Sequence, residues 1–130
     1  MKLKPAELWD AWQTSAEIRE VAEGWITKQQ NDWTEDDKRL YSTLKSSPDQ
    51  MLATIFAIMQ MTDDETVLAN LAAGPLEDFL GRHGEMCLEA IEALAKAHKR
   101  LREVLNGVWQ GAMTKRVWHR IEILKQSAYS

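Results

Sequence analysis

Hydrophobic side chains recur three and four residues apart along most of the chain, which is the spacing of one face of an α-helix. Residues 15–30 show the pattern clearly, with Ile18, Val21 and Trp25 on one side. No stretch alternates hydrophobic and polar residues with a period of two, so no β-strand is predicted. Helices are predicted over residues 5–13, 15–30, 63–73, 75–83, 85–99 and 101–108, and from residues 34, 48 and 115 onward.

Three of these helix starts are marked by side-chain oxygens that would cap the free N–H groups of the first helical turn. In a capping box, Ser or Thr accepts a hydrogen bond from the backbone N–H three residues later, and Glu or Gln at that position bonds back. The pattern occurs at Thr14 with Glu17, Ser47 with Gln50, and Thr62 with Glu65. Helices are therefore expected to begin directly after Thr14, Ser47 and Thr62.

Glycine and proline are expected to divide the middle of the chain into short helices. Gly74 is predicted to end one helix in the left-handed conformation that glycine adopts readily. Pro75 then begins a short helix, and Glu77 and Asp78 suit the positive end of its dipole. Gly84 is predicted to end that helix.

Short helices joined by tight corners predict an all-α fold, and a length of 130 residues is typical of one domain. Residues 1–130 are therefore expected to form a single helical domain. The pattern favours a compact bundle of about seven to nine short helices, and a HEAT-like stack of helix pairs is the alternative.

Composition is that of an ordinary globular protein, with 45% hydrophobic and 28% charged residues. The most apolar stretch, Met51 to Met61, is far shorter than the ~20 apolar residues that span a bilayer, so a buried helix is expected there. No apolar signal-peptide core follows the first residues, so a cytoplasmic protein without a membrane segment is expected. The single cysteine, Cys87, lies among apolar neighbours and is interpreted as a structural thiol.

Charge is distributed unevenly along the chain, whose net charge is −4: residues 1–95 carry −10 and residues 96–130 carry +6. The basic end either binds an anionic partner or folds back on the acidic body, and the spread of its cations favours the second. Nucleic acid is not an expected partner, because the acidic remainder would repel a phosphate backbone. The cations of the basic end are Lys96, Lys99, Arg100, Arg102, Lys115, Arg116, Arg120 and Lys125.

Residue patterns of known catalytic and metal sites are missing from the sequence. It has no nucleophile elbow, no phosphate-binding P-loop and no His-Glu-x-x-His zinc motif. His83 follows Glu77 and Asp78, but those carboxylates belong to the first turn of a helix and His83 to its apolar face. A non-enzymatic protein without catalytic residues, metal or cofactor is predicted. A small hydrolase or ligand-binding protein centred on His83 is the weaker alternative.

Six tryptophans favour contacts with another protein, because tryptophan offers a large apolar area with one polar group. Trp25 and Trp118 fall on hydrophobic faces and are predicted to be core residues. Trp9, Trp12 and Trp33 lie in segments too polar for full burial. They are expected either to cap the end of the bundle or to anchor a partner.

The segment from Leu71 to Gly84 reads Leu-Ala-Ala-Gly-Pro-Leu-Glu-Asp-Phe-Leu-Gly-Arg-His-Gly. It resembles the hallmark of a bacterial domain family of unknown function, whose members carry an AAGPLEDLL-x-x-HG-like motif. Weaker similarity extends from Trp25 through Pro48 and on to Trp109, and Phe79 replaces the commoner leucine. The resemblance implies a small bacterial cytoplasmic helical protein and supplies no activity. The motif, residues 72–84, is interpreted as a joint between helices, with Gly74, Pro75, Leu76, Glu77, Asp78, His83 and Gly84 as its key positions.

The leading functional hypothesis is a non-enzymatic protein-binding protein, such as a bacterial immunity or antitoxin-like protein that neutralises a toxin. Small size, acidity and tryptophans suit that role, and an acidic helical surface would complement a basic cleft in the toxin. Self-association through acidic and basic faces is the alternative. The predicted partner-binding residues are Asp32, Trp33, Glu35, Asp36, Asp37, Asp63 and Asp64.

Overall fold

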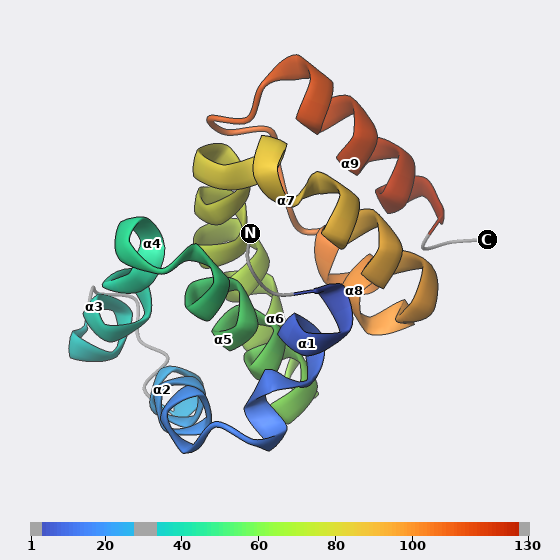
Figure 1. Cartoon of the computed structure of the whole chain (residues 1–130). Helices are drawn as coiled ribbons and strands as arrows, with labels where there is room; N and C mark the ends of the chain where they lie inside the picture. Colours follow the sequence, from blue (N-terminus) through green and yellow to red (C-terminus); the bar gives the residue numbers. More distant parts are fainter. Residues whose placement is uncertain (1–3, 28–33, 128–130) are drawn as a thin grey trace.

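Helix α5 (Pro48–Met61) forms the centre of the computed structural model, which describes residues 4–27 and 34–127 (Figure 1). Because this helix is hydrophobic on all sides, every residue from Met51 to Met59 is buried. Thr54 is the buried polar residue among them, and its hydroxyl donates to the Gln50 carbonyl at 2.8 Å. The predicted buried helix at this position is confirmed.

The other helices surround α5, and the described residues contain no strand. Their bounds are α1 (Pro5–Asp10), η1 (Ala11–Gln13), α2 (Ala16–Thr27), α3 (Glu35–Tyr41), α4 (Thr43–Ser46), α6 (Glu65–Leu71), η2 (Ala72–Leu76), α7 (Glu77–Ala97), α8 (Lys99–Leu105) and α9 (Lys115–Ser127). The predicted compact all-α fold is confirmed. None of the helices in residues 4–27 and 34–127 has the length and apolar character that a bilayer crossing requires.

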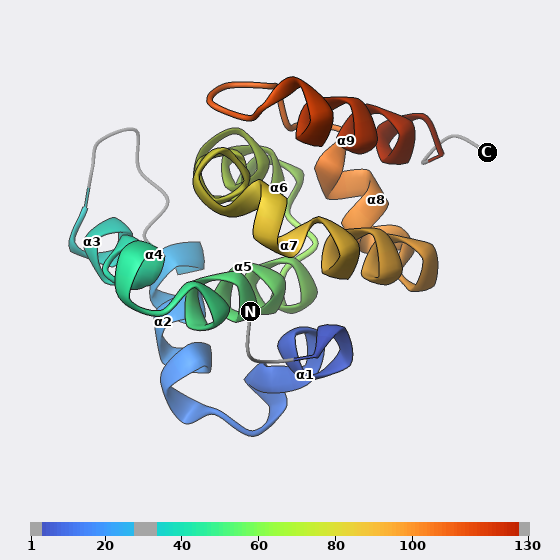
Figure 2. The ribbon, with the colours of Figure 1, turned by 45° about the horizontal axis from the view of Figure 1, so that its top comes forward.

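The helices form layers on both sides of α5. Figure 2 shows α5 between α1 on one side and α6 and α7 on the other, with α9 outermost. α9 lies against α7 and α8, and its buried face carries Val117, Ile121 and Leu124. The basic carboxyl-terminal part therefore covers α7, whose first turns hold residues 77–84 of the motif.

Polar side chains attach the amino-terminal helices to α5. The Gln60 amide donates to the carbonyls of Trp9 and Phe56 at 2.8 and 3.0 Å, and its oxygen accepts from Trp12 Nε1 at 3.0 Å. The Trp9 ring is only 6% exposed and stacks on His98 with 4.1 Å between ring centroids. The polar neighbours of Trp9 and Trp12 predict that neither is fully buried. This prediction is wrong for Trp9, whereas Trp12 is only partly buried, as predicted.

The helix starts are close to their predicted places, but the capping residues differ. Ser15, not Thr14, caps α2 by accepting from the Ile18 N–H at 3.2 Å. Asp64, not Thr62, caps α6 by accepting from two backbone N–H groups. Ser47 precedes α5 without a side-chain cap. The three predicted capping boxes are therefore wrong. At α2 and α6 a neighbouring side-chain oxygen caps the helix in a different register.

Candidate functional site

The motif lies within one continuous helical run. α6 passes into the π-helical turn η2, and η2 passes directly into α7, which continues through Gly84 to Ala97. The predicted helix ends at Gly74 and Gly84 are therefore wrong. Among the described residues only Gly111 has a positive φ, of 49°. The wider hydrogen-bond spacing of a π turn lets the helix pass Pro75, which has no N–H to donate.

Glycines in the motif allow α9 and the loop before it to approach α7 closely. A Cβ on Gly81 would lie 3.0 Å from the Ala112 Cβ, and one on Gly84 would lie 2.8 Å from Val117 Cγ1. Gly84 is buried, and Val117 is 1% exposed. These glycines therefore serve packing between helices and do not end a helix.

The polar motif residues bind three different parts of the chain. Glu77 Oε1 accepts from the backbone N–H of Trp109 at 2.9 Å, which holds the loop before α9. Asp78 accepts a hydrogen bond from the Tyr41 hydroxyl, and His83 Nε2 lies 2.6 Å from the Leu44 carbonyl oxygen. The motif thus joins α7 to α3, α4 and the loop before α9.

Two titratable side chains of the fold, Tyr41 and Cys87, are held in their protonated forms. Burial, followed by the hydrogen bond to Asp78, raises the pKa of Tyr41 well above its usual range, so the phenol remains a donor. Burial also raises the pKa of the Cys87 thiol to about 12, which keeps it protonated. No group of three or more His, Cys, Asp or Glu side chains in the described residues is placed to hold a metal ion.

The acidic residues predicted near α3 are partly used by the fold. Thr34 and Asp37 form a capping box, in which the Thr34 N–H donates to Asp37 Oδ2 at 2.8 Å. Asp37 Oδ1 also accepts from Trp25 Nε1 at 2.9 Å, and Trp25 is buried as predicted. Glu35 is exposed and pairs with Lys38 at 2.9 Å. Asp36 is half-buried, and the predicted residues Asp32 and Trp33 lie outside the described residues.

Asp63 and Asp64 lie apart from the α3 group. They follow the carboxyl-terminal end of α5, whereas α3 and α4 precede its amino-terminal end (Figure 1). Asp63 pairs with Arg100, and Asp64 caps α6. The fold therefore divides the predicted acidic surface into two groups and gives Asp37 and Asp64 capping roles.

The basic end of the chain folds back on the acidic body. Arg116 pairs with Glu85 of α7, and Arg120 pairs with Glu92 at 2.5 Å. The pairing of Asp63 with Arg100 adds a third contact of this kind. Of the two alternatives that the sequence left open, internal neutralisation agrees better with these pairs.

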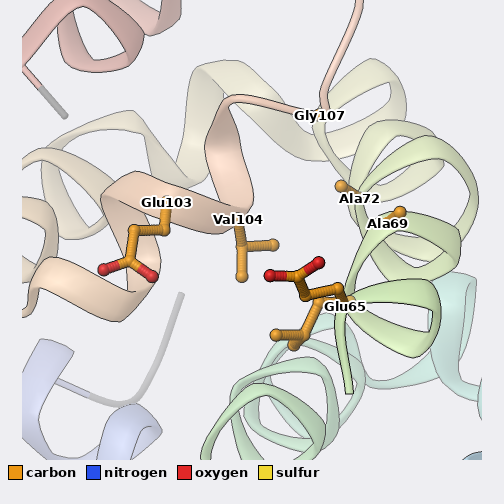
Figure 3. A pocket seen from close by; sticks show the side chains of 7 residues that line it. Glu65, Ala69, Ala72, Glu103, Val104 and Gly107 are labelled. Carbon is orange, nitrogen blue, oxygen red and sulfur yellow. The ribbon is translucent and has the colours of Figure 1, made fainter. Parts of the chain in front are cut away.

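An open groove lies between α6 and α8, and no sequence pattern singled it out. Figure 3 shows Glu65 on one wall and Glu103 and Val104 on the other, with the Glu65 carboxylate directed toward Val104. The groove has a volume of about 240 Å³. Glu65 is exposed and forms no ion pair with the described residues, whereas Glu103 lies 3.8 Å from Lys99. The residues that line the groove are Glu65, Leu68, Ala69, Ala72, Glu103, Val104 and Gly107.

Close packing shuts one end of the groove. A Cβ on Gly107 would lie 2.9 Å from the Ala72 Cβ, so the end of α8 contacts the π turn directly. π turns inside helices frequently occur at functional sites. The small side chains of Ala69 and Ala72 leave the space above them unfilled, and this produces an apolar floor on the same side of the groove as Glu65.

Comparison with known proteins places the chain in a family. Residues 21–129 match DUF6869, a family of unknown function. The chain belongs to DUF6869. No curated protein and no solved structure matches it. The predicted membership of an uncharacterised family is confirmed, and the function of this DUF6869 chain has to be inferred from its surface.

Proposed function

We propose that this DUF6869 chain is a non-enzymatic protein-binding protein whose groove between α6 and α8 receives a basic segment of a partner protein. The observation that carries the proposal is the open groove, which has an apolar floor and carries Glu65 and Glu103 on its two walls. An aliphatic side chain of the partner would occupy the floor. A neighbouring lysine or arginine would pair with the carboxylates.

The dimensions of the groove favour a protein side chain over a small-molecule substrate. Pockets for drug-sized ligands measure roughly 300–1,000 Å³, and this groove of about 240 Å³ is smaller and open. Burying one Leu or Met side chain there contributes on the order of 1.5–3 kcal/mol. The adjacent carboxylates mainly raise the association rate and select a basic partner.

A bacterial toxin with a basic cleft is the partner that best fits this chemistry, and cytoplasmic neutralisation of such a toxin is the proposed role. A second acidic area, on α2 and α3, carries the exposed side chains of Glu20, Glu23 and Glu35, of which Glu20 and Glu35 pair with Arg39 and Lys38. Together with the net charge of −4, they would steer a cationic partner toward the molecule. Self-association has less support, because Arg116 and Arg120 already pair within the chain.

Filling the groove, or reversing the charge of one of its walls, is expected to weaken partner binding at least tenfold. Ala69 is exposed, so Ala69→Arg blocks the floor without entering the core, and Glu65→Lys reverses the unpaired carboxylate. Binding of the purified product of the adjacent gene is measured by calorimetry. Glu23→Lys is the matched control, because it makes the same charge change on exposed α2 and is expected to change the affinity less than threefold.

Two results would refute the groove proposal. One is unchanged affinity in both Ala69→Arg and Glu65→Lys, and the other is no binding by the unmodified chain. If Asp36→Lys alone abolishes binding, the contact surface is the acidic face of α3, as the sequence predicts, and not the groove.

A further inference from the structure

Lys125 of α9 lies between two tryptophan rings. Its ammonium nitrogen is 5.0 Å from the centroid of the Trp109 ring and 4.9 Å from that of Trp118. The same nitrogen donates to the Val108 carbonyl oxygen at 2.7 Å. Two indole faces and one carbonyl thus form a site for an alkylammonium ion, which we call the cation site. Trp118, whose place on a hydrophobic face predicts a core residue, is only partly buried.

The fold holds the cation site in place independently of Lys125. The Trp109 N–H donates to Glu77 of the motif, and the adjacent Val108 side chain is fully buried. Gly111 adopts the left-handed conformation and brings the loop close to Glu77. A Cβ on Gly111 would lie 3.2 Å from Glu77 Oε2. The Trp109 side chain nevertheless remains 70% exposed. A large aromatic side chain is therefore presented to solvent on a braced loop.

We propose that the cation site binds a lysine side chain of a protein partner and that Lys125 occupies the site in the isolated chain. Cation–π attraction contributes about 0.5–1 kcal/mol at exposed sites and more when the cation is desolvated. A partner lysine that replaces Lys125 gains the same two ring faces and the same carbonyl acceptor. The replacement therefore costs little, because one ammonium leaves as the other enters.

A partner bound in the groove would hold its lysine at a high local concentration near the cation site, and this would allow that lysine to replace Lys125. Gly107 lines the groove, and Val108 and Trp109 follow it directly, so the Cα atoms of Gly107 and Trp109 lie no more than about 7 Å apart. A partner held in the groove would keep its lysine near the cation site, as Lys125 is kept there by its own helix. This step rests on the proposed protein-binding function.

The cation site is tested with n-butylammonium chloride, whose alkyl chain and ammonium match a lysine side chain. Indole N–H resonances of the full-length chain are followed by NMR in wild type, Lys125→Ala and Lys125→Gln. Both Lys125 variants leave the site vacant. In them, n-butylammonium is expected to give saturable shifts of the Trp109 and Trp118 resonances at concentrations at least tenfold lower than in wild type. The double variant Trp109→Ala/Lys125→Ala is expected to lose this response.

Controls separate the site from general salt effects and from the groove. Lys115→Ala removes an exposed lysine of the same helix and is expected to respond like wild type, and n-butanol tests the need for charge. Equal shifts with sodium chloride, or no gain in either folded Lys125 variant, would overturn the proposal and leave Lys125 with a stabilising role only. Neither result bears on the groove, because butylammonium binding is measured without a protein partner.

Discussion

Replacing Phe79 with alanine is expected to lower the free energy of unfolding by about 3–5 kcal/mol, the range for removing a buried aromatic side chain. The Phe79 side chain is fully buried, and its ring centroid lies 5.2 Å from that of His83. The substitution leaves a cavity in the first turns of α7, where the motif joins that helix to its neighbours. Urea unfolding followed by circular dichroism measures the loss.

Phe79→Leu is the matched control, because leucine keeps most of the apolar volume and is commoner in the motif that the sequence resembles. We expect it to cost less than about 1.5 kcal/mol. A loss for Phe79→Ala below about 1.5 kcal/mol would contradict the central position that the structure gives this residue.

Replacing Gly84 with alanine is expected to destabilise the fold by about 1–2 kcal/mol, even though alanine favours helices by about 1 kcal/mol. The added methyl group would lie 2.8 Å from Val117 Cγ1, on a buried branched side chain with little freedom to move. α9 would therefore have to shift away from α7. Thermal unfolding measures the change.

Gly74→Ala is the control for Gly84→Ala within the same motif. Apart from its chain neighbours and the backbone of its own helix, the nearest atom to an added Cβ is the Tyr41 hydroxyl oxygen at 4.0 Å, and Gly74 lies inside the helical run without a positive φ. Alanine is therefore expected to change the stability by less than about 1 kcal/mol, because its preference for helices is offset by the contact of its Cβ with the ring of the following Pro75. Destabilisation by Gly74→Ala together with a neutral Gly84→Ala would support the helix ends that the sequence predicts.

The helical elements could largely be predicted because their signals are local. Pro5 and Pro48 each begin a helix, Thr34 caps α3, and α9 begins directly after Thr114. The apolar character of α5 predicted its burial. In each case the responsible side chains and backbone groups lie within a few residues of one another.

The errors within the motif have a non-local cause. Glycine next to proline normally indicates a helix end, and the sequence alone does not show which distant residue requires a glycine. Gly84 is small because Val117, more than thirty positions later, packs on it. Trp9 was misjudged for a related reason, since its neighbour Asp10 points to solvent while Trp9 contacts Phe56 and His98.

The candidate site was harder to predict than the fold. The walls of the groove come from residues 65–72 and 103–107, which only the folded chain brings together. Small residues such as Ala69, Ala72 and Gly107 are the signal in the sequence, but small residues occur for many reasons. The acidic residues were easy to identify, yet carboxylates at helix starts also serve as caps, which is the role of Asp37 and Asp64.

Amide hydrogen exchange across residues 76–97 tests most directly whether the motif lies inside one continuous helix. The amides of Glu85, Met86 and Cys87 are predicted to exchange as slowly as those of residues 88–94, because all of them lie within α7. Fast exchange confined to Glu85, Met86 and Cys87 would contradict this structure. It would show that a new helix starts after Gly84, since the first N–H groups of a helix have no partner within it.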